Sequence, residues 1–174
     1  MKPRPVIALA LPRAVGVESI AELADVELTE AAECDQIADR LAPELPEGFS
    51  LGSIEQAEGK PAASRVRAVH YLVDVAGDLD WDAAIHRYMA ADEAVVTRSA
   101  PNKAAKRIDV RSYCSQVERV PSGLAARIEL TGAGTARPEE VATAVAATLG
   151  ATPTITRIVR TQIVLHEQPV GVPT

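Results

Sequence analysis

The chain has 174 residues and a net charge of −6, and 47% of its residues are hydrophobic although it holds only one Trp and one Phe. The length allows one large domain or two small ones, and the hydrophobic content excludes wholesale disorder. The core must be built from Ala, Val, Ile and Leu, and the scarcity of aromatic rings disfavours single-strand recognition by base stacking.

Charge is distributed unevenly along the chain. Residues 17–60 hold twelve acidic side chains against two basic ones, whereas residues 98–119 hold six basic side chains against two acidic ones. This separation predicts an oriented partner surface, and the alternative is two ordinary solvated faces. Cys34 and Cys114 belong to no CxxC or CxH pair, which favours a reducing cytoplasm. No stretch approaches the ~20 apolar residues that cross a bilayer, so no membrane association is expected.

The first third of the chain predicts three strands and a helix. The apolar run 6–11 is only six residues long, so it predicts a strand rather than a secretory signal, which needs about 7–15 apolar residues. A helix is expected over 35–45, between further strands over 24–29 and 49–55. The Gly, Pro and Ser residues of 56–64 predict a domain boundary.

The rest of the chain predicts strands interrupted by two helices. Asp80 is a suitable N-cap for the first helix, and Pro138 suits the first position of the second. A basic loop is expected over 99–106 and a Pro/Gly tail over 169–174. The expected strands are 66–75, 94–98, 107–111, 124–131 and 155–166, and the expected helices are 81–91 and 138–149.

Two segments repeat the order strand, turn, helix, strand. They are residues 24–56 and 125–160, and VELTE in the first segment corresponds to IELTG in the second. This order is the second half of a ferredoxin-like βαββαβ unit. The predicted fold is therefore α+β with two ferredoxin-like units in tandem, a partial one over 1–58 that lacks its opening strand and helix, and a complete one over 65–168. An unpaired strand edge in the partial unit would favour a homodimer.

No catalytic or cofactor-binding motif is recognisable. There is no GxSxG nucleophile motif, and no Ser or Cys has a recognisable His partner. Asp82 and His86 stand at i and i+4, but no third ligand is predictable, so a solvated helix pair is favoured over a metal site. The stretch GAGTARPEE (132–140) lacks GxGxxG and a Walker lysine, which predicts a turn and a helix cap. No metal, cofactor or catalysis of its own is expected.

The stretch VTRSAPNKAAKRIDVRS (96–112) is the most distinctive. Residues two apart on a strand share a face, so Arg107, Asp109 and Arg111 are expected to form one polar row. A basic arm over 98–111 would contact phosphates, and the alternative is a charged hairpin in which Asp109 pairs with a neighbouring arginine. The candidate contact residues are Arg98, Lys103, Lys106, Arg107, Asp109 and Arg111.

Five stretches occur in a suggestive order: ALALPRAVGVESIAELADVELTE (8–30), LPEGF (45–49), KRIDVRS (106–112), GTARPEEV (134–141) and IVRT (158–161). Together they resemble the radical SAM-linked domain of unknown function, a bacterial family found fused to, or encoded beside, a radical SAM protein. Members of that family usually begin earlier, with a strand and helix containing Ser-His-x-Asp and then an FNPHP-like turn. KPRP (2–5) stands at that turn here. The resemblance therefore implies an N-terminally truncated member, or an element supplied by another chain.

The resemblance implies a non-catalytic accessory domain that presents a substrate to a radical S-adenosylmethionine enzyme. RNA is suggested by the family's genomic association with an RNase of the E/G type and with ribosomal proteins. The chain cannot itself be such an enzyme, because Cys34 and Cys114 cannot supply CxxxCxxC for the cluster. The alternative is a stand-alone RNA-binding ferredoxin-like module, which the acidic upstream half and the lack of strand aromatics disfavour.

Overall fold

The computed structural model describes residues 6–57, 59–100 and 103–166, which form a mixed α+β molecule. The predicted 2–5 turn segment and the 169–174 tail lie outside the described residues. In chain order the elements are β1 (Val6–Leu9), β2 (Glu18–Ser19), β3 (Ala24–Glu27), α1 (Cys34–Leu41), β4 (Val66–Ala76), α2 (Trp81–Ala90), β5 (Val95–Ala100), β6 (Lys103–Asp109), β7 (Gln116–Val120), β8 (Gly123–Glu129), α3 (Pro138–Ala147) and β9 (Thr154–Leu165).

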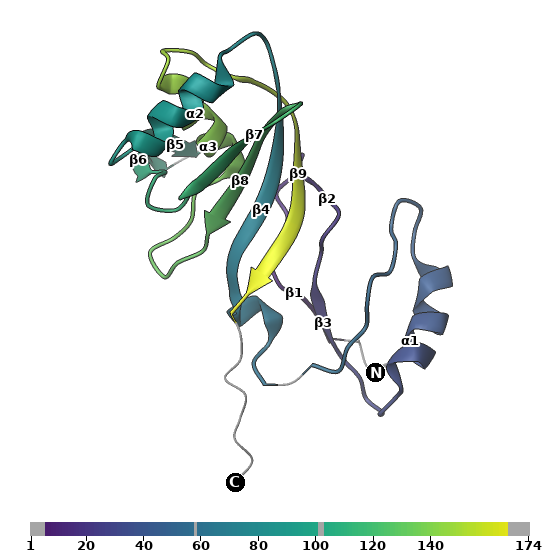
Figure 1. Ribbon diagram of the computed structural model, residues 1–174. Coiled ribbons are helices and arrows are strands. Elements are labelled where there is room, and N and C mark those ends of the chain that lie inside the picture. The colour runs from purple at the N-terminus through teal and green to yellow at the C-terminus, as the bar shows by residue number, and fades with distance from the viewer. Residues whose placement is uncertain (1–5, 58, 101–102, 167–174) are drawn as a thin grey trace.

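The largest sheet has five strands in the order β2-β9-β4-β8-β7. Its pairs are antiparallel except for β2, which runs parallel to β9 at the edge of the sheet. From β4 to β9 the chain follows the order strand, helix, hairpin, strand, strand, helix, strand. Helices α2 and α3 lie on one face of this sheet, and the β5–β6 hairpin lies beside them (Figure 1).

The core lies between this sheet and the two helices. Alternate residues of β4 point toward the helices, and Val69 and Val73 are fully buried. Trp81, Ala84 and Tyr88 form the buried stripe of α2, as helical periodicity requires. The predicted N-cap is confirmed, since Asp80 Oδ1 accepts a hydrogen bond from the Ala83 amide at 3.0 Å.

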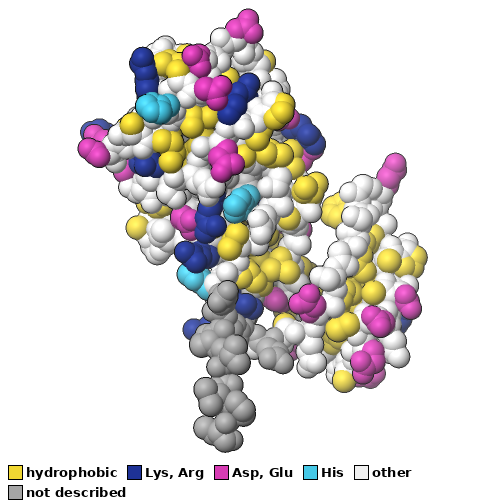
Figure 2. Space-filling model, viewed as in Figure 1, with side chains coloured by type: hydrophobic (Ala, Val, Ile, Leu, Met, Phe, Trp, Pro, Cys, Tyr) yellow, Lys and Arg dark blue, Asp and Glu magenta, His cyan; other side chains and the backbone are white. Residues whose placement is uncertain are grey.

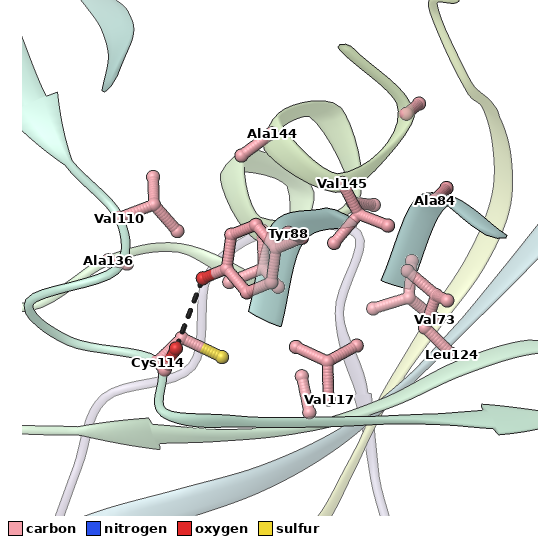
Figure 3. Close-up of a cluster of buried hydrophobic side chains, with 14 of the residues drawn as sticks. Val73, Ala84, Tyr88, Val110, Cys114, Val117, Leu124, Ala136, Ala144 and Val145 are labelled. Atoms are coloured by element: carbon pink, nitrogen blue, oxygen red, sulfur yellow. Dashed lines mark hydrogen bonds between the residues drawn. The ribbon is translucent and has the colours of Figure 1, made fainter. Parts of the chain in front are cut away.

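One aromatic ring fills the centre of this core. The Tyr88 ring lies among small aliphatic side chains from the sheet and from α3, and its hydroxyl donates to the Cys114 carbonyl at 3.1 Å (Figure 3). Burial raises the pKa of Tyr88, and burial likewise raises the pKa of the Cys114 thiol to about 11. Both groups are therefore protonated at neutral pH, as expected of structural core residues.

The upstream half differs from its prediction. Strands β1 and β3 form a separate two-stranded antiparallel sheet. The predicted strand over 49–55 is wrong, because these residues have no strand partner to complete their backbone hydrogen bonds. The described residues upstream of β4 therefore do not show the second unit of the predicted tandem.

Two strands were not predicted, and the expected basic loop is shorter. β2 has only two residues, and β7 buries only Val117 fully, so neither carries a clear alternation. The predicted loop over 99–106 is mostly strand, since β5 extends to Ala100 and β6 begins at Lys103.

Helix α1 has no buried residue. It lies apart from the five-stranded sheet, on the far side of β1 and β3 (Figure 1). In the described ranges, no helix combines the length and the apolar character that spanning a bilayer requires.

Candidate functional site

The predicted basic arm is the β5–β6 hairpin. Cross-strand pairing places Thr97 opposite Arg107 and Arg98 opposite Lys106. Lys106 and Arg107 are exposed, whereas the side chain of Lys103 lies outside the described part of the chain. The hairpin therefore presents two basic side chains of the candidate set to solvent.

Arg98 is an internal anchor of the hairpin. Its guanidinium makes two hydrogen bonds to the Glu140 carboxylate, both at 2.6 Å, and a third to the Thr135 carbonyl at 3.0 Å. Glu140 is 8% exposed and also accepts from the Arg137 amide at 2.8 Å. Burial alone would raise the pKa of Glu140, but these hydrogen bonds outweigh it and lower the pKa. The ion pair joins the hairpin to the first turn of α3.

Asp109 and Arg111 organise the turn that follows β6. Because the strand ends at Asp109, the polar row predicted from Arg107 does not extend to Arg111. Asp109 accepts from the backbone amides of Ala94 and Arg111, at 2.9 and 3.1 Å, and from the Ser112 hydroxyl. Burial raises the pKa of Asp109, but these hydrogen bonds lower it by more, so the pKa lies below its ordinary value.

The Arg111 guanidinium turns back onto the core. It donates to the carbonyls of Cys114 and Ala91, at 2.9 and 3.2 Å, and its Cζ lies 5.2 Å from the centroid of the Tyr88 ring. Most N–H donors of Arg111 thus bind backbone carbonyls of the same chain. Among the described candidate residues, Lys106 and Arg107 remain as those whose side chains point to solvent.

A groove that the sequence did not predict lies on the helix side of the sheet. Its volume is about 400 Å³, and it opens between the loop 11–17 and the segment 135–139 at the start of α3. Val69, Ile128 and Leu130 contribute apolar lining, with Tyr71 and Arg160 among its polar residues. Three of the stretches that carry the family resemblance, 8–30, 134–141 and 158–161, meet at this groove.

Arg160 holds one wall of the groove in place. It is 2% exposed, and its guanidinium donates to the carbonyls of Leu11 and Pro12 at 2.9 and 3.2 Å. The same group pairs with the Glu22 carboxylate at 3.1 Å. The sequence could have predicted the face on which Arg160 lies. Arg160 follows the partly buried Ile158 by two residues on one strand, so both side chains point to the same face of the sheet.

The opposite face of the sheet carries a shallow polar depression. Its volume is about 80 Å³, and His70, Glu118 and Arg127 are among its lining residues. Tyr71 is the one aromatic residue of β4, β7, β8 and β9, and it packs against the core on the helix side. Among the described residues, this face therefore offers the His70 imidazole but no Phe, Tyr or Trp ring on which exposed bases could stack.

Large hydrophobic side chains are exposed over the upstream segment. Outside it, the described chain exposes only Met89 and Val95 among large hydrophobics. Figure 2 shows such side chains on the right-hand lobe, interspersed with acidic ones. The upstream set is Val6, Ile7, Leu9, Val15, Ile20, Leu23, Val26, Leu28, Leu41 and Phe49.

No group of three metal-ligating side chains converges within residues 6–57, 59–100 and 103–166. Cys114 is buried and Cys34 is partly buried, and both are free thiols.

Comparison with known proteins identifies the family. The bacterial family described as "Uncharacterized protein conserved in bacteria (DUF2344)" matches residues 1–154. The chain belongs to this family. No curated protein matches the chain. One solved structure, "Crystal Structure of a Cbf5-Nop10-Gar1 Complex", is similar at 17% identity and a TM-score of 0.38, over 59% of this chain and 32% of the other.

Proposed function

We propose that this DUF2344 member is a non-catalytic accessory domain that docks onto a radical S-adenosylmethionine enzyme and presents a substrate to it. The sequence resemblance described above suggests the partner. The observation that carries the docking is the exposed apolar surface of residues 6–49, since monomeric proteins rarely leave such surface uncovered.

The proposed docking element is the β1–β3 ribbon. Cross-strand pairing sets Ile7 beside Val26 and Leu9 beside Ala24, so one face of the ribbon is wholly apolar and exposed. A two-stranded ribbon also has free edges that accept a further strand. In the proposal, an extended segment of the partner pairs with a free edge of the ribbon, and apolar side chains of the partner cover its exposed face.

Charge favours a different polypeptide as the partner over a second copy. Residues 17–60 carry twelve acidic and two basic side chains. A second copy docked through the same segment would bring like charges together, which is unfavourable across an interface. The proposed partner surface is therefore basic around an apolar centre.

The proposed substrate class is RNA, contacted by Lys106 and Arg107. The Arg98–Glu140 ion pair would hold these two side chains at a fixed position relative to α3. The stand-alone RNA-binding module is the second candidate, and the exposure of the same two residues favours it. In the described part of the sheet, the exposed face offers that module only the His70 ring for stacking, so its binding would depend mainly on phosphate contacts.

Docking is tested by isothermal titration of the chain with a radical SAM protein of the kind that the resembled family accompanies, taken from the same genome. Ile7→Glu places a charge on the apolar face of β1, whereas Ala8→Glu places the same charge on its opposite face. We expect Ile7→Glu to weaken association at least about tenfold, because a buried unpaired carboxylate is costly, and Ala8→Glu to have little effect. Absence of association, or equal effects of the two variants, would contradict the proposal.

RNA contact is tested by measuring affinity for a single-stranded RNA over a range of salt concentrations. The double variant Lys106→Ala/Arg107→Ala removes two exposed basic groups and should reduce the salt slope for a single strand by about 1.4. The matched control Arg40→Ala/Lys60→Ala removes the same charge from the acidic segment and should leave the slope unchanged. A slope unaltered by the hairpin variant would remove the hairpin from the proposal while leaving the docking intact.

A further inference from the structure

The groove between residues 11–17 and 135–139 has the dimensions of a small-molecule site. Its volume of about 400 Å³ falls in the range of about 300–1,000 Å³ that is usual for such sites. Apolar side chains dominate the lining, among them Val17, Val69, Ile128 and Leu130. A ligand with a flat apolar body would replace water on these surfaces.

The polar groups of the groove are mainly hydrogen-bond donors. Tyr71 stands directly opposite Arg160 on the neighbouring strand, so their side chains share one face of the sheet. The Tyr71 hydroxyl makes no hydrogen bond to a described residue, and Arg160 Nε is buried and likewise unpaired within the described chain. Arg160 Nε is the buried donor that is rarely left unpaired, and the partly exposed Tyr71 hydroxyl is open to an acceptor, so this floor suits a ligand that contributes acceptor oxygens.

The charges around the groove restrict the ligand further. At its rim, Arg137 Nη1 lies 3.8 Å from Glu139 Oε1, and both side chains are about half exposed. Because this ion pair is long and exposed, the Arg137 guanidinium can also bind a second acidic group. Glu22 partly neutralises the charge of Arg160, and Glu139 partly neutralises that of Arg137. A dianionic phosphate would therefore be repelled by these carboxylates more strongly than a ligand with a single carboxylate.

From these features we infer that the groove binds a small organic monocarboxylate with an apolar, ring-sized body. The body lies against Val69, Ile128 and Leu130, and the carboxylate accepts hydrogen bonds from the Tyr71 hydroxyl and from Arg137. The site is separate from the proposed docking ribbon and from the hairpin, and it depends on neither.

Phenylacetate is the probe, titrated into the full ¹⁵N-labelled chain and followed by amide chemical shifts. Phenethylamine and phenyl phosphate, with the same ring but a cationic or dianionic group, are the comparison ligands. We expect saturable shifts in residues 11–17 and 135–139 with phenylacetate, and binding at least about tenfold weaker for the other two. Equal affinities, absence of saturation, or shifts confined to β1 and β3 would overturn the inference.

Two tyrosine variants test the assignment of the floor. Tyr71→Phe removes only a hydroxyl that has no described partner, so folding should be unaffected. Phenylacetate affinity should fall about tenfold or more, the usual effect of losing a hydrogen bond to a charged group. Tyr113→Phe removes a hydroxyl outside the groove lining and should leave affinity unchanged. An unchanged affinity of Tyr71→Phe for phenylacetate would also overturn the inference. The docking variant Ile7→Glu should bind phenylacetate as the natural protein does.

Discussion

The Arg98–Glu140 ion pair links two segments that lie 42 positions apart in the chain. Its geometry is bidentate and Glu140 is almost wholly buried, so the pair is shielded from solvent in a way that surface ion pairs are not. The Glu140 carboxylate also accepts a hydrogen bond from the Arg137 amide. One acidic side chain therefore caps α3 and joins the β5–β6 hairpin to it.

This arrangement predicts a dependence of stability on pH. The pKa of Glu140 is lowered in the folded state, so its contribution is complete above the ordinary glutamate value of about 4.3 and is lost as the pH falls through the folded pKa. We expect the free energy of unfolding in urea to decline less steeply toward about pH 3 in Glu140→Gln than in the natural protein. Glu139→Gln, in the same turn but half exposed, is the control and should keep the natural slope.

Helices α1 and α3 differ in what stabilises them. Seven of the ten residues of α3 are buried, whereas none of the eight residues of α1 is. An isolated helix of this length is marginal in water, because most helical stability in proteins comes from packing. In the free chain, α1 therefore contributes little to the cooperative fold.

Two glycine substitutions measure this difference. Ala142→Gly, at a fully buried position of α3, should lower the free energy of unfolding by at least about 1 kcal/mol. Ala38→Gly, at a partly exposed position of α1, should change it by less than about 0.5 kcal/mol. Chemical denaturation followed by Trp81 fluorescence reports the core in both variants. A loss of similar size in Ala38→Gly would show that α1 is part of the cooperative unit.

At the scale of the whole molecule, the upstream segment is attached to the sheet at few points. β2 pairs with the edge of β9, the Ile20 amide donates to the Arg160 carbonyl at 3.0 Å, and the Arg160 guanidinium holds the loop 11–17. Among the described residues, the buried cluster around Tyr88 contains none upstream of Tyr71, and the buried Val69 lies outside this cluster at the groove. The attachment is therefore polar and local, and the core does not depend on it.

Substitution of Arg160 should loosen this attachment without unfolding the core. In Arg160→Gln we expect amide hydrogen exchange at Ala10 and Ile20 to accelerate at least about tenfold, while exchange in β4 and α3 stays slow. Arg157→Gln is the matched control, since Arg157 lies on the same strand but pairs with Glu18 at an exposed site. Slow exchange at Ala10 and Ile20 in Arg160→Gln would show that β2 alone is sufficient.

The elements around the core could be predicted from the sequence because each has its own local pattern. Strand β4 alternates, α2 has a helical stripe and a cap, and α3 begins at a proline. The strand expected over 49–55 had an acceptable composition, but a strand forms only where another strand pairs with it, and no local pattern reports that.

The candidate sites show the same limit. The exposure of Lys106 and Arg107 followed from charge density on a predicted hairpin. The internal role of Arg98 did not, because it depends on Glu140 in a distant turn. The groove could not be predicted either, since its walls, 11–17 and 135–139, are far apart in the sequence and meet only in the folded molecule.

The hydrogen bond from Arg160 to the Leu11 carbonyl spans 149 positions, which has a consequence for biosynthesis. At about 5–20 residues per second, the ribosome adds β9 roughly 7–30 s after it has made the loop that β9 secures. Throughout that interval the nascent N-terminal segment, with its uncovered apolar side chains, lacks its attachment to β9. A docking partner present during translation would therefore encounter β1 before the sheet that anchors it exists.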